Sequence, residues 1–437
     1  MPLLQLPKLP ILLTLVLCLV ACDVSQQFMQ LGKHLASPID VAVADTGAYF
    51  YVINADHDRT YDQGSILVVS ETGKKLRAIP TPRLASSISV AGDNMLVTFM
   101  QSTESEQSEV HRYSIQTPAA PQLKKRWQVD CLPLQSVQRV GYRYFFVGCT
   151  DGTLLRGDYD TDTLRPVRKY HHPRRAMYLD TEQGLLLAFP TSLGQPVADR
   201  RLEDSEGASG EVDNGSTGDS NSGNFVPDVW EKGQVPAHVA AVYQFAIYDI
   251  KADTRNAPVS EMHWLTYDSL ATAKKYYRTS FWHATPDPDG RSSFYLSQRG
   301  ALPTASHSAN NVVKVIINSD LRTNGRHALT FEQAVESPHK LWYPSHLVAQ
   351  RLDNIGNVLF IGSLRDRASW PREDTYSSIV VQTPAWQSKV SRGDGAELGA
   401  FAVNARGIML TVAFFSNRLR MFKLAPTAEE FQEIILE

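Results

Sequence analysis

Apolar and polar positions alternate along short segments of this chain, and the segments are joined by turns centred on glycine. The clearest case spans residues 38–54 (PIDVAVADTGAYFYVIN), where Ile39, Val41 and Val43 alternate with Asp40 and Ala42. A period of two is the pattern of a half-buried β-strand. A glycine between two such strands supplies the positive φ that a tight hairpin needs. The segment therefore predicts a β-hairpin whose second strand is aromatic and β-branched.

The same unit recurs along the chain. Its turns centre on Gly47, Gly92, Gly141, Gly184, Gly290, Gly356 and Gly407. Most units continue into a second apolar run, such as residues 64–69 or 311–317. Two hairpins per unit, at a spacing of roughly 40–50 residues, are typical of the four-stranded blade of a β-propeller. We therefore expect an all-β chain with a single β-propeller of seven four-stranded blades over residues 37–426.

Two other architectures are compatible with parts of this pattern. One is an eight-bladed propeller in which one blade is too divergent to detect. The other is a pair of stacked β-sandwiches, but the steady return of a single unit argues against it. The last segment, residues 427–437, is a short amphipathic stretch and is expected to form a C-terminal tail.

One long gap interrupts the repeat between Gly184 and Gly290, and it contains a polar insertion at about residues 192–238 in the fourth blade. The insertion is rich in Gly, Ser, Asp and Glu and poor in apolar residues. Such a segment cannot offset its ordering entropy by burial, so we expect a disordered loop. Asp213, Asn214 and Asp219 offer oxygen ligands for calcium, but the strict spacing of an EF-hand loop is missing.

A second calcium-like segment begins with Asp158, Asp160 and Asp162. The sixth position of this loop is Thr163 where an EF-hand has Gly, and the twelfth is Lys169 where it has Glu. The same residues are common in a turn between the outer strands of a blade. We therefore predict a turn here rather than a metal site.

The N-terminus has the features of an export signal. Lys8 is the single charge among the first ten residues, residues 11–20 are almost continuously apolar, and small residues precede Cys22. The apolar run is shorter than the roughly 20 residues that a membrane-spanning helix needs. Residues 1–21 are therefore expected to be a signal peptide that is removed.

The segment Leu19-Val20-Ala21-Cys22 resembles the lipobox of bacterial lipoproteins. That resemblance implies a lipid on Cys22, cleavage before it, and a membrane anchor followed by a tether over residues 22–36. An ordinary secretory signal ending near a cysteine is the alternative. Asp23 resembles the signal that retains lipoproteins in the inner membrane, which favours the periplasmic face of that membrane. Anchoring in the outer membrane is left open.

The first unit resembles the YVTN-type, WD-like repeat of bacterial surface and periplasmic propellers. The resemblance rests on Pro-x-x-Val-x-Val, a turn with Gly, and residues 51–54, Tyr-Val-Ile-Asn. Units two to seven lack that terminal asparagine. The architecture is therefore predicted from the spacing of the units rather than from the repeat's name.

Two cysteines remain after export and lipidation, Cys131 and Cys149. They lie symmetrically about residue 140 in the third unit, and residues equidistant from a hairpin turn face each other. An even pair in an oxidising compartment predicts a disulfide, with two buried free thiols as the alternative. The formal charge of -3 provides no basic surface for nucleic acid, and we expect neither a haem nor another resident cofactor.

Histidine, arginine and tyrosine residues are expected to gather at one mouth of the propeller's central channel. They lie in loops that precede the first strand of a unit or follow its second strand, and such loops surround the same mouth. This predicted mouth comprises His57, Asp58, Arg59, His171, His172, Arg174, Tyr277, Arg278, His283, Tyr343, His346, Arg365 and Arg367. Side chains of these types can hold a metal, an anion or a peptide.

Two functions from different classes follow. The first is a lipid-anchored scaffold of the cell envelope, which binds another envelope component through loops on a rigid frame. The second is an enzyme with a site at the channel mouth, either a metal-assisted hydrolase similar to propeller lactonases or an oxidoreductase-associated protein. The sequence has no Gly-x-Ser-x-Gly, His-Glu-x-x-His or glycine-rich phosphate loop. The scaffold is therefore the first hypothesis.

Overall fold

Antiparallel hairpins account for nearly all the regular structure among the described residues of this chain. The computed structural model describes residues 31–57, 61, 63–100, 107–170, 173–191, 244–250, 262–264, 280–290, 292–299, 311–324, 328–334, 344–353, 355–363, 378–383, 387–391, 398–414, 417–424 and 431–434. None of the helices in these ranges is long and apolar enough to cross a membrane.

The described residues form seven four-stranded sheets, each built from four consecutive strands. Blade 1 contains β1 (Pro38–Val43), β2 (Tyr49–Asn54), β3 (Gly64–Ser70) and β4 (Lys75–Thr81). Blade 2 contains β5 (Ala85–Ala91), β6 (Asn94–Phe99), β7 (Ser108–Ser114) and β8 (Gln122–Val129). Blade 3 contains β9 (Pro133–Val137), β10 (Tyr144–Cys149), β11 (Thr153–Asp158) and β12 (Thr163–Lys169). Blade 4 contains β13 (Arg174–Asp180), β14 (Leu185–Pro190), β15 (Gln244–Asp249) and β16 (Met262–Trp264).

The remaining blades follow the same order. Blade 5 contains β17 (Ser280–Pro286), β18 (Ser293–Arg299), β19 (Asn311–Ile317) and β20 (Leu329–Gln333), with the short helix α6 (Leu321–Asn324) before β20. Blade 6 contains β21 (Pro344–Leu352), β22 (Gly356–Ser363), β23 (Ser378–Gln382) and β24 (Gln387–Ser391). Blade 7 contains β25 (Leu398–Val403), β26 (Ile408–Ala413), β27 (Arg418–Leu424) and β28 (Phe431–Ile434).

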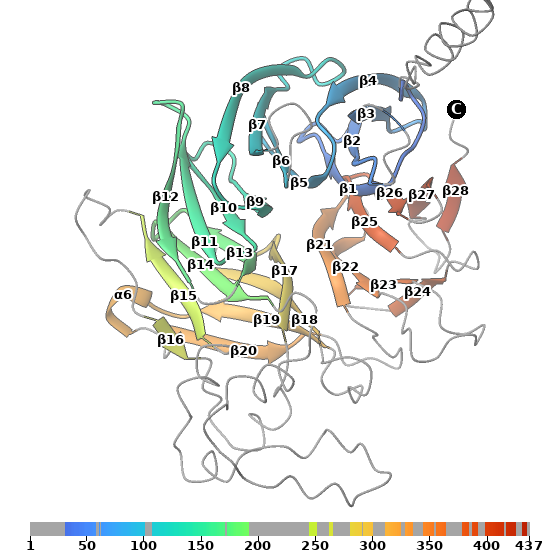
Figure 1. Cartoon of the computed structure of the whole chain (residues 1–437). Helices are drawn as coiled ribbons and strands as arrows, with labels where there is room; N and C mark the ends of the chain where they lie inside the picture. Colours follow the sequence, from blue (N-terminus) through green and yellow to red (C-terminus); the bar gives the residue numbers. More distant parts are fainter. Residues whose placement is uncertain are drawn as a thin grey trace, which may run out of the picture.

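The first strands of the seven sheets contact one another around a closed ring, in which β1 meets both β5 and β25. Figure 1 shows these strands gathered at the centre, with the later strands of each sheet further out. The chain is a seven-bladed β-propeller. The fold class predicted from the spacing of the hairpins is confirmed, including four strands per blade.

The hydrophobic core is divided among the interfaces between blades. Seven clusters of buried apolar side chains lie between successive blades, and each joins residues of two neighbouring sheets. Both faces of every blade are therefore covered. This explains why the second strands, such as β14, are buried along their whole length instead of alternating.

Side chains, not a backbone ladder, link the inner strands of adjacent blades. The Ser86 hydroxyl donates to the Pro133 carbonyl at 2.6 Å, and the Ser89 and Ser136 hydroxyls are 2.7 Å apart. These bonds give partly buried hydroxyls a partner in the neighbouring blade. They also fix the inner strands at a set separation around the axis.

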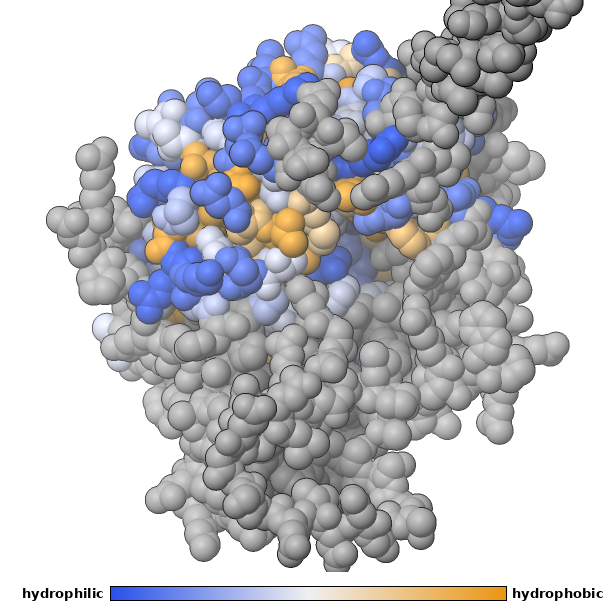
Figure 2. All heavy atoms as spheres, viewed as in Figure 1, coloured by the Kyte–Doolittle hydropathy of each residue, from blue (hydrophilic) through white to orange (hydrophobic). Residues whose placement is uncertain are grey.

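The outer surface is mixed. On the face shown in Figure 2, hydrophilic side chains dominate the rim of the described surface, and apolar ones lie mainly toward the middle. Among the described residues, the exposed large apolar side chains are Leu123, Leu132 and Val140. All three lie in blades 2 and 3 or the connection between them.

Two details of the predicted organisation differ from the structure. β28 occupies residues expected to form a C-terminal tail and completes blade 7, because its backbone pairs with β27. Six of the seven hairpin glycines have positive φ, but Gly290 does not. A Cβ at Gly290 would meet the Ser293 hydroxyl. The lack of room for a side chain, and not a positive φ, therefore favours glycine there.

The insertion lies between β14 and β15, the second and third strands of blade 4. This is the blade in which it was expected. Its residues, including Asp213, Asn214 and Asp219, lie outside the described ranges, so their predicted disorder stays a prediction. The predicted signal segment and Cys22 also lie outside these ranges.

Candidate functional site

Most of the predicted mouth lies outside the described residues. This holds for Asp58, Arg59, His171, His172, Tyr277, Arg278, Tyr343, Arg365 and Arg367. The described members are His57, Arg174, His283 and His346. All four lie at the end of the sheets where first strands begin and second strands finish, as the pairing of Pro38 with Asn54 in blade 1 illustrates.

These four residues do not form one group. His57 is exposed and its ring contacts Phe414 of blade 7 at 5.4 Å between ring centroids. Arg174 is buried, and its guanidinium lies 4.8 Å from the Tyr170 ring centroid. Burial lowers the pKa of Arg174 to about 10. Its place is the interface between blades 3 and 4 and not the mouth.

Every inner strand carries a register irregularity near its start. In blades 4, 5 and 6 the irregular stretches run from Arg174 to Ala176, from Phe281 to Ala284 and from Pro344 to Leu347. A β-bulge turns side chains away from the alternation of the strand. Here the residues within the bulges are Arg175, Trp282, His283, Ser345 and His346.

Five side chains from four blades form a polar group on the inner strands, which we call the axial cluster. It comprises Asp40 of β1, Arg175 of β13, Trp282 and His283 of β17, and His346 of β21. The Arg175 guanidinium carbon lies 4.0 Å from the Trp282 ring centroid. The rings of His283 and His346 lie 4.1 Å apart between centroids, and His346 also contacts Phe401 of β25 at 5.3 Å.

Burial and the neighbouring cation keep both imidazoles neutral. Burial, with the charge on Arg175 acting in the same direction, lowers the pKa of His346 to about 3. Burial, the neighbouring His346 and Arg175 lower the pKa of His283 well below its usual value. The Nδ1 atom of His283 accepts a hydrogen bond from the Leu347 backbone N–H at 3.3 Å. In the neutral ring the proton therefore resides on Nε2.

Asp40 is buried and holds the inner strands of blades 1 and 2 together. Its two carboxylate oxygens accept backbone hydrogen bonds from Val41 at 2.9 Å and Ile88 at 3.0 Å. Burial raises the pKa of Asp40 to about 6, against the opposing effect of these bonds and of the charge on Arg175. Burial lowers the pKa of Arg175 to about 10, and Asp40 opposes that shift.

The fold is shared with solved structures, but the sequence offers no close match. No family model matches the chain, and no curated protein sequence matches it. Kuenenia stuttgartiensis hydrazine synthase is similar in structure, with a TM-score of 0.54 and 12% identity over 91% of this chain and 99% of that one. The Cps50 (Swd1) β-propeller domain of Myceliophteria thermophila has a TM-score of 0.52 and 10% identity, over 91% and 100% of the two chains. This likeness shows the fold alone.

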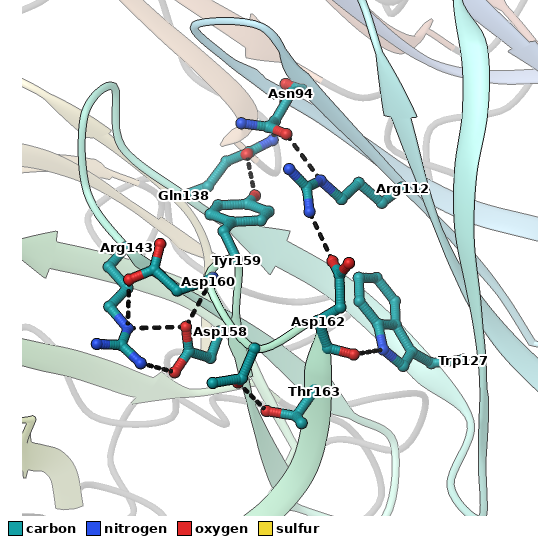
Figure 3. A network of polar contacts seen from close by, with 11 residues as sticks. Asn94, Arg112, Trp127, Gln138, Arg143, Asp158, Tyr159, Asp160, Asp162 and Thr163 are labelled. Atoms are coloured by element: carbon teal, nitrogen blue, oxygen red, sulfur yellow. Dashed lines mark hydrogen bonds and ion pairs between the residues drawn. The ribbon is translucent and has the colours of Figure 1, made fainter.

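The aspartates of the calcium-like segment are engaged with arginines in this propeller. They lie in and beside the turn between β11 and β12, where a turn was predicted. Figure 3 shows Arg143 contacting Asp158 and Asp160, and Arg112 contacting Asp162. The Arg112 contact joins blade 2 to blade 3, so this group links neighbouring blades.

The two cysteines form a disulfide, with their Cα atoms 5.9 Å apart. The register predicted for them is wrong, however. Cys149 pairs with Pro133 across an irregularity in the ladder, and Cys131 precedes β9. The hairpin turn lies further along the chain than residue 140, so the sulfurs meet beside the ladder and not across it.

A groove of 460 Å³ lies at the opposite end of the propeller. It is lined by the turns that end β3, β21 and β25, with Glu71, Asp353, Arg406 and Lys423 among its charged residues. Arg406 and Glu71 form an ion pair of 2.5 Å across it. The charges are mixed, so the groove favours no single class of ligand.

The sequence did not single out Asp40, Arg175 or Trp282. Alternation assigns Asp40 to a solvent-facing strand position, and it gives no reason to choose Arg175 over its neighbour Arg174. A bulge changes which of two adjacent residues turns inward, and single-sequence alternation contains no sign of it. The sequence feature that could have pointed to this site is Trp282, an aromatic residue near the start of an inner strand.

Proposed function

We propose that this chain is a lipid-anchored propeller of the bacterial cell envelope that binds another envelope component. The binding surface is the end of the propeller where first strands begin. The proposal combines the lipoprotein-like N-terminus with the arrangement of connections around the seven blades.

The observation that carries the proposal is the asymmetry of the two ends. Connections from each first strand to the second are short turns, such as residues 44–48 and 404–407. The opposite end receives far longer connections in blades 4, 5 and 6, namely residues 191–243, 265–279 and 364–377. Long loops on a rigid scaffold are the usual place for recognition.

The same end carries the axial cluster, three of whose four strands belong to blades 4, 5 and 6. Of these strands, β17 begins directly after the connection of residues 265–279. β13 and β21 lie in the blades whose second and third strands are joined by residues 191–243 and 364–377. Perturbed titratable groups gathered at the end of a propeller favour a binding role there over a purely structural one.

A metal-assisted enzyme is less compatible with the cluster. The Nδ1 lone pair of His283 is occupied by the Leu347 N–H, and its Nε2 carries the proton. The adjacent Arg175 charge disfavours a second cation. A binding role therefore explains the arrangement of the axial cluster without the metal ion that this kind of catalysis would require.

Site-specific photocrosslinking in native membranes tests the proposal. A crosslinking amino acid at position 57 lies at the proposed binding end, and one at position 46 lies in an exposed turn at the other end. We expect a discrete adduct from position 57 that is absent from position 46. Identical adducts from both positions, or none from position 57, would contradict a directional binding surface.

A further inference from the structure

Among the side chains of the axial cluster, Arg175 carries a buried donor atom that the described protein leaves unsatisfied. Its Nε is buried without a hydrogen-bond partner in the described part of the chain. It stacks on Trp282 but forms no ion pair with Asp40, whose oxygens accept from Val41 and Ile88. Leaving a buried charged donor unpaired is costly. An acceptor from outside the chain would remove that cost.

The groups around Arg175 define the chemistry of such an acceptor. His283 presents an Nε2–H donor, because its Nδ1 accepts from Leu347. Trp282 and Phe401 supply aromatic walls beside Arg175 and His346. The site therefore offers the positive charge of Arg175, further N–H donors and apolar contact. The Asp40 carboxylate of the same cluster accepts backbone hydrogen bonds from Val41 and Ile88.

This combination discriminates between ligand classes. A divalent metal would meet the Arg175 charge and a histidine whose lone pair is already occupied. A phosphate dianion would find a single permanent cation between aromatic side chains. A carboxylate carries one negative charge, and its planar oxygens match the fork of a guanidinium.

We propose that the axial cluster binds a small organic monocarboxylate, with Arg175 as its charge partner and His283 as a second donor. The ligand lies between the aromatic side chains of Trp282 and Phe401. This site does not depend on the proposed envelope partner, since its ligand is a small molecule held by the inner strands.

The test uses the full chain purified in detergent, with sodium benzoate and sodium acetate as probes. Sodium chloride and sodium phosphate at equal ionic strength are the comparison salts. The melting temperature and the affinity by titration calorimetry are measured for the unmodified chain and three variants. Arg175→Met removes the charge, and Arg175→Lys keeps it without the planar fork. Arg351→Gln is the matched control, because Arg351 is exposed on an inner strand outside the cluster.

We expect the carboxylates to raise the melting temperature of the unmodified chain and of Arg351→Gln by several degrees. The shift is lost in Arg175→Met, and the affinity falls at least tenfold in Arg175→Lys. No carboxylate-dependent shift in the unmodified chain would overturn the proposal, as would an equal shift with chloride or phosphate. If Arg175→Met does not fold, Arg175→Lys decides, and unchanged affinity in that variant rejects the site.

Discussion

Two adjacent arginines on β13 have opposite surroundings. Arg174 is buried between blades 3 and 4 against Tyr170, whereas Arg175 stacks on Trp282 near the axis. The register irregularity between Arg174 and Ala176 produces this difference. At the scale of single residues, a local change in strand geometry therefore decides which charge is available to a ligand.

His346 should make the folded chain sensitive to acid. Its pKa lies at about 3 in the folded chain, whereas the ordinary pKa of a histidine is 6.5. Between pH 6.5 and about pH 3, this histidine is therefore protonated in the unfolded chain and neutral in the folded chain. The stability that His346 contributes is fully present above pH 6.5 and is lost as the pH falls toward 3.

We expect His346→Phe to reduce the loss of unfolding free energy between pH 7 and pH 4. The full shift corresponds to about 5 kcal/mol, which is an upper limit. Urea unfolding at both pH values measures the difference between the two proteins. His57→Phe is the control for replacing a histidine at the same end but outside the axial cluster. Equal acid sensitivity in His346→Phe and the unmodified chain would show that this imidazole is solvated in the folded state.

At the scale of elements, turns and bulges together determine how the strands of a hairpin pair. The hairpin turn at Gly141 was placed correctly by sequence, and that glycine has positive φ. The ladder of β9 with β10 is nevertheless displaced from the symmetric arrangement about residue 140. A turn glycine marks the presence of a hairpin, but the residues on either side of it determine the pairing.

The disulfide should stabilise blade 3. Closing a loop of 18 residues contributes about 3 kcal/mol in the chain-entropy model. We expect the Cys131→Ala, Cys149→Ala double variant to melt several degrees lower while keeping its β-rich circular dichroism. Non-reducing peptide mapping of the unmodified chain should recover one linked pair of peptides. Free thiols that react with an alkylating agent, in protein prepared under oxidising conditions, would contradict the pairing.

At the scale of the whole molecule, side chains close the ring between blades 7 and 1. No described blade takes strands from both ends of the chain, since each contains four consecutive strands. A shared hydrophobic cluster joins these two blades, and Asn404 Nδ2 donates to the Gly47 carbonyl at 2.8 Å. Asn404 Oδ1 also accepts from the backbone of Arg406 and Ile408. Asn404 therefore shapes one turn and attaches it to another.

Asn404→Ala should weaken this closure. It leaves a buried carbonyl and two backbone N–H groups without their partner, at a cost of about 2–3 kcal/mol. Chemical denaturation measures the loss, and limited proteolysis should show earlier cleavage in blades 1 and 7. Asn94→Ala is the matched control, because its partner Arg112 lies within the same blade and the expected cost is about 1 kcal/mol. Equal losses in the two variants would mean that closure does not depend on Asn404.

The proposed lipid on Cys22 would determine where the whole molecule is held. We expect Cys22→Ala to release the protein from membranes or to leave it unprocessed, since the lipid on this cysteine is the proposed tether. Fractionation after a high-salt wash and the mobility of the processed chain provide the measurement. A variant that is still processed and remains with the membranes would rule out lipidation as the tether.

Local signals in the sequence determined the hairpins, the number of blades, the place of the insertion and the choice of cysteines that pair. Alternation, turn glycines and cysteine number are each read within one unit, so they need no knowledge of how units pack. The tertiary structure decided which side chains reach the axis. Asp40, Arg175, His283 and His346 belong to four different blades, and bulges set the direction of the last three. Contacts between such distant segments depend on ring closure and strand irregularity, which the pattern of one strand does not contain.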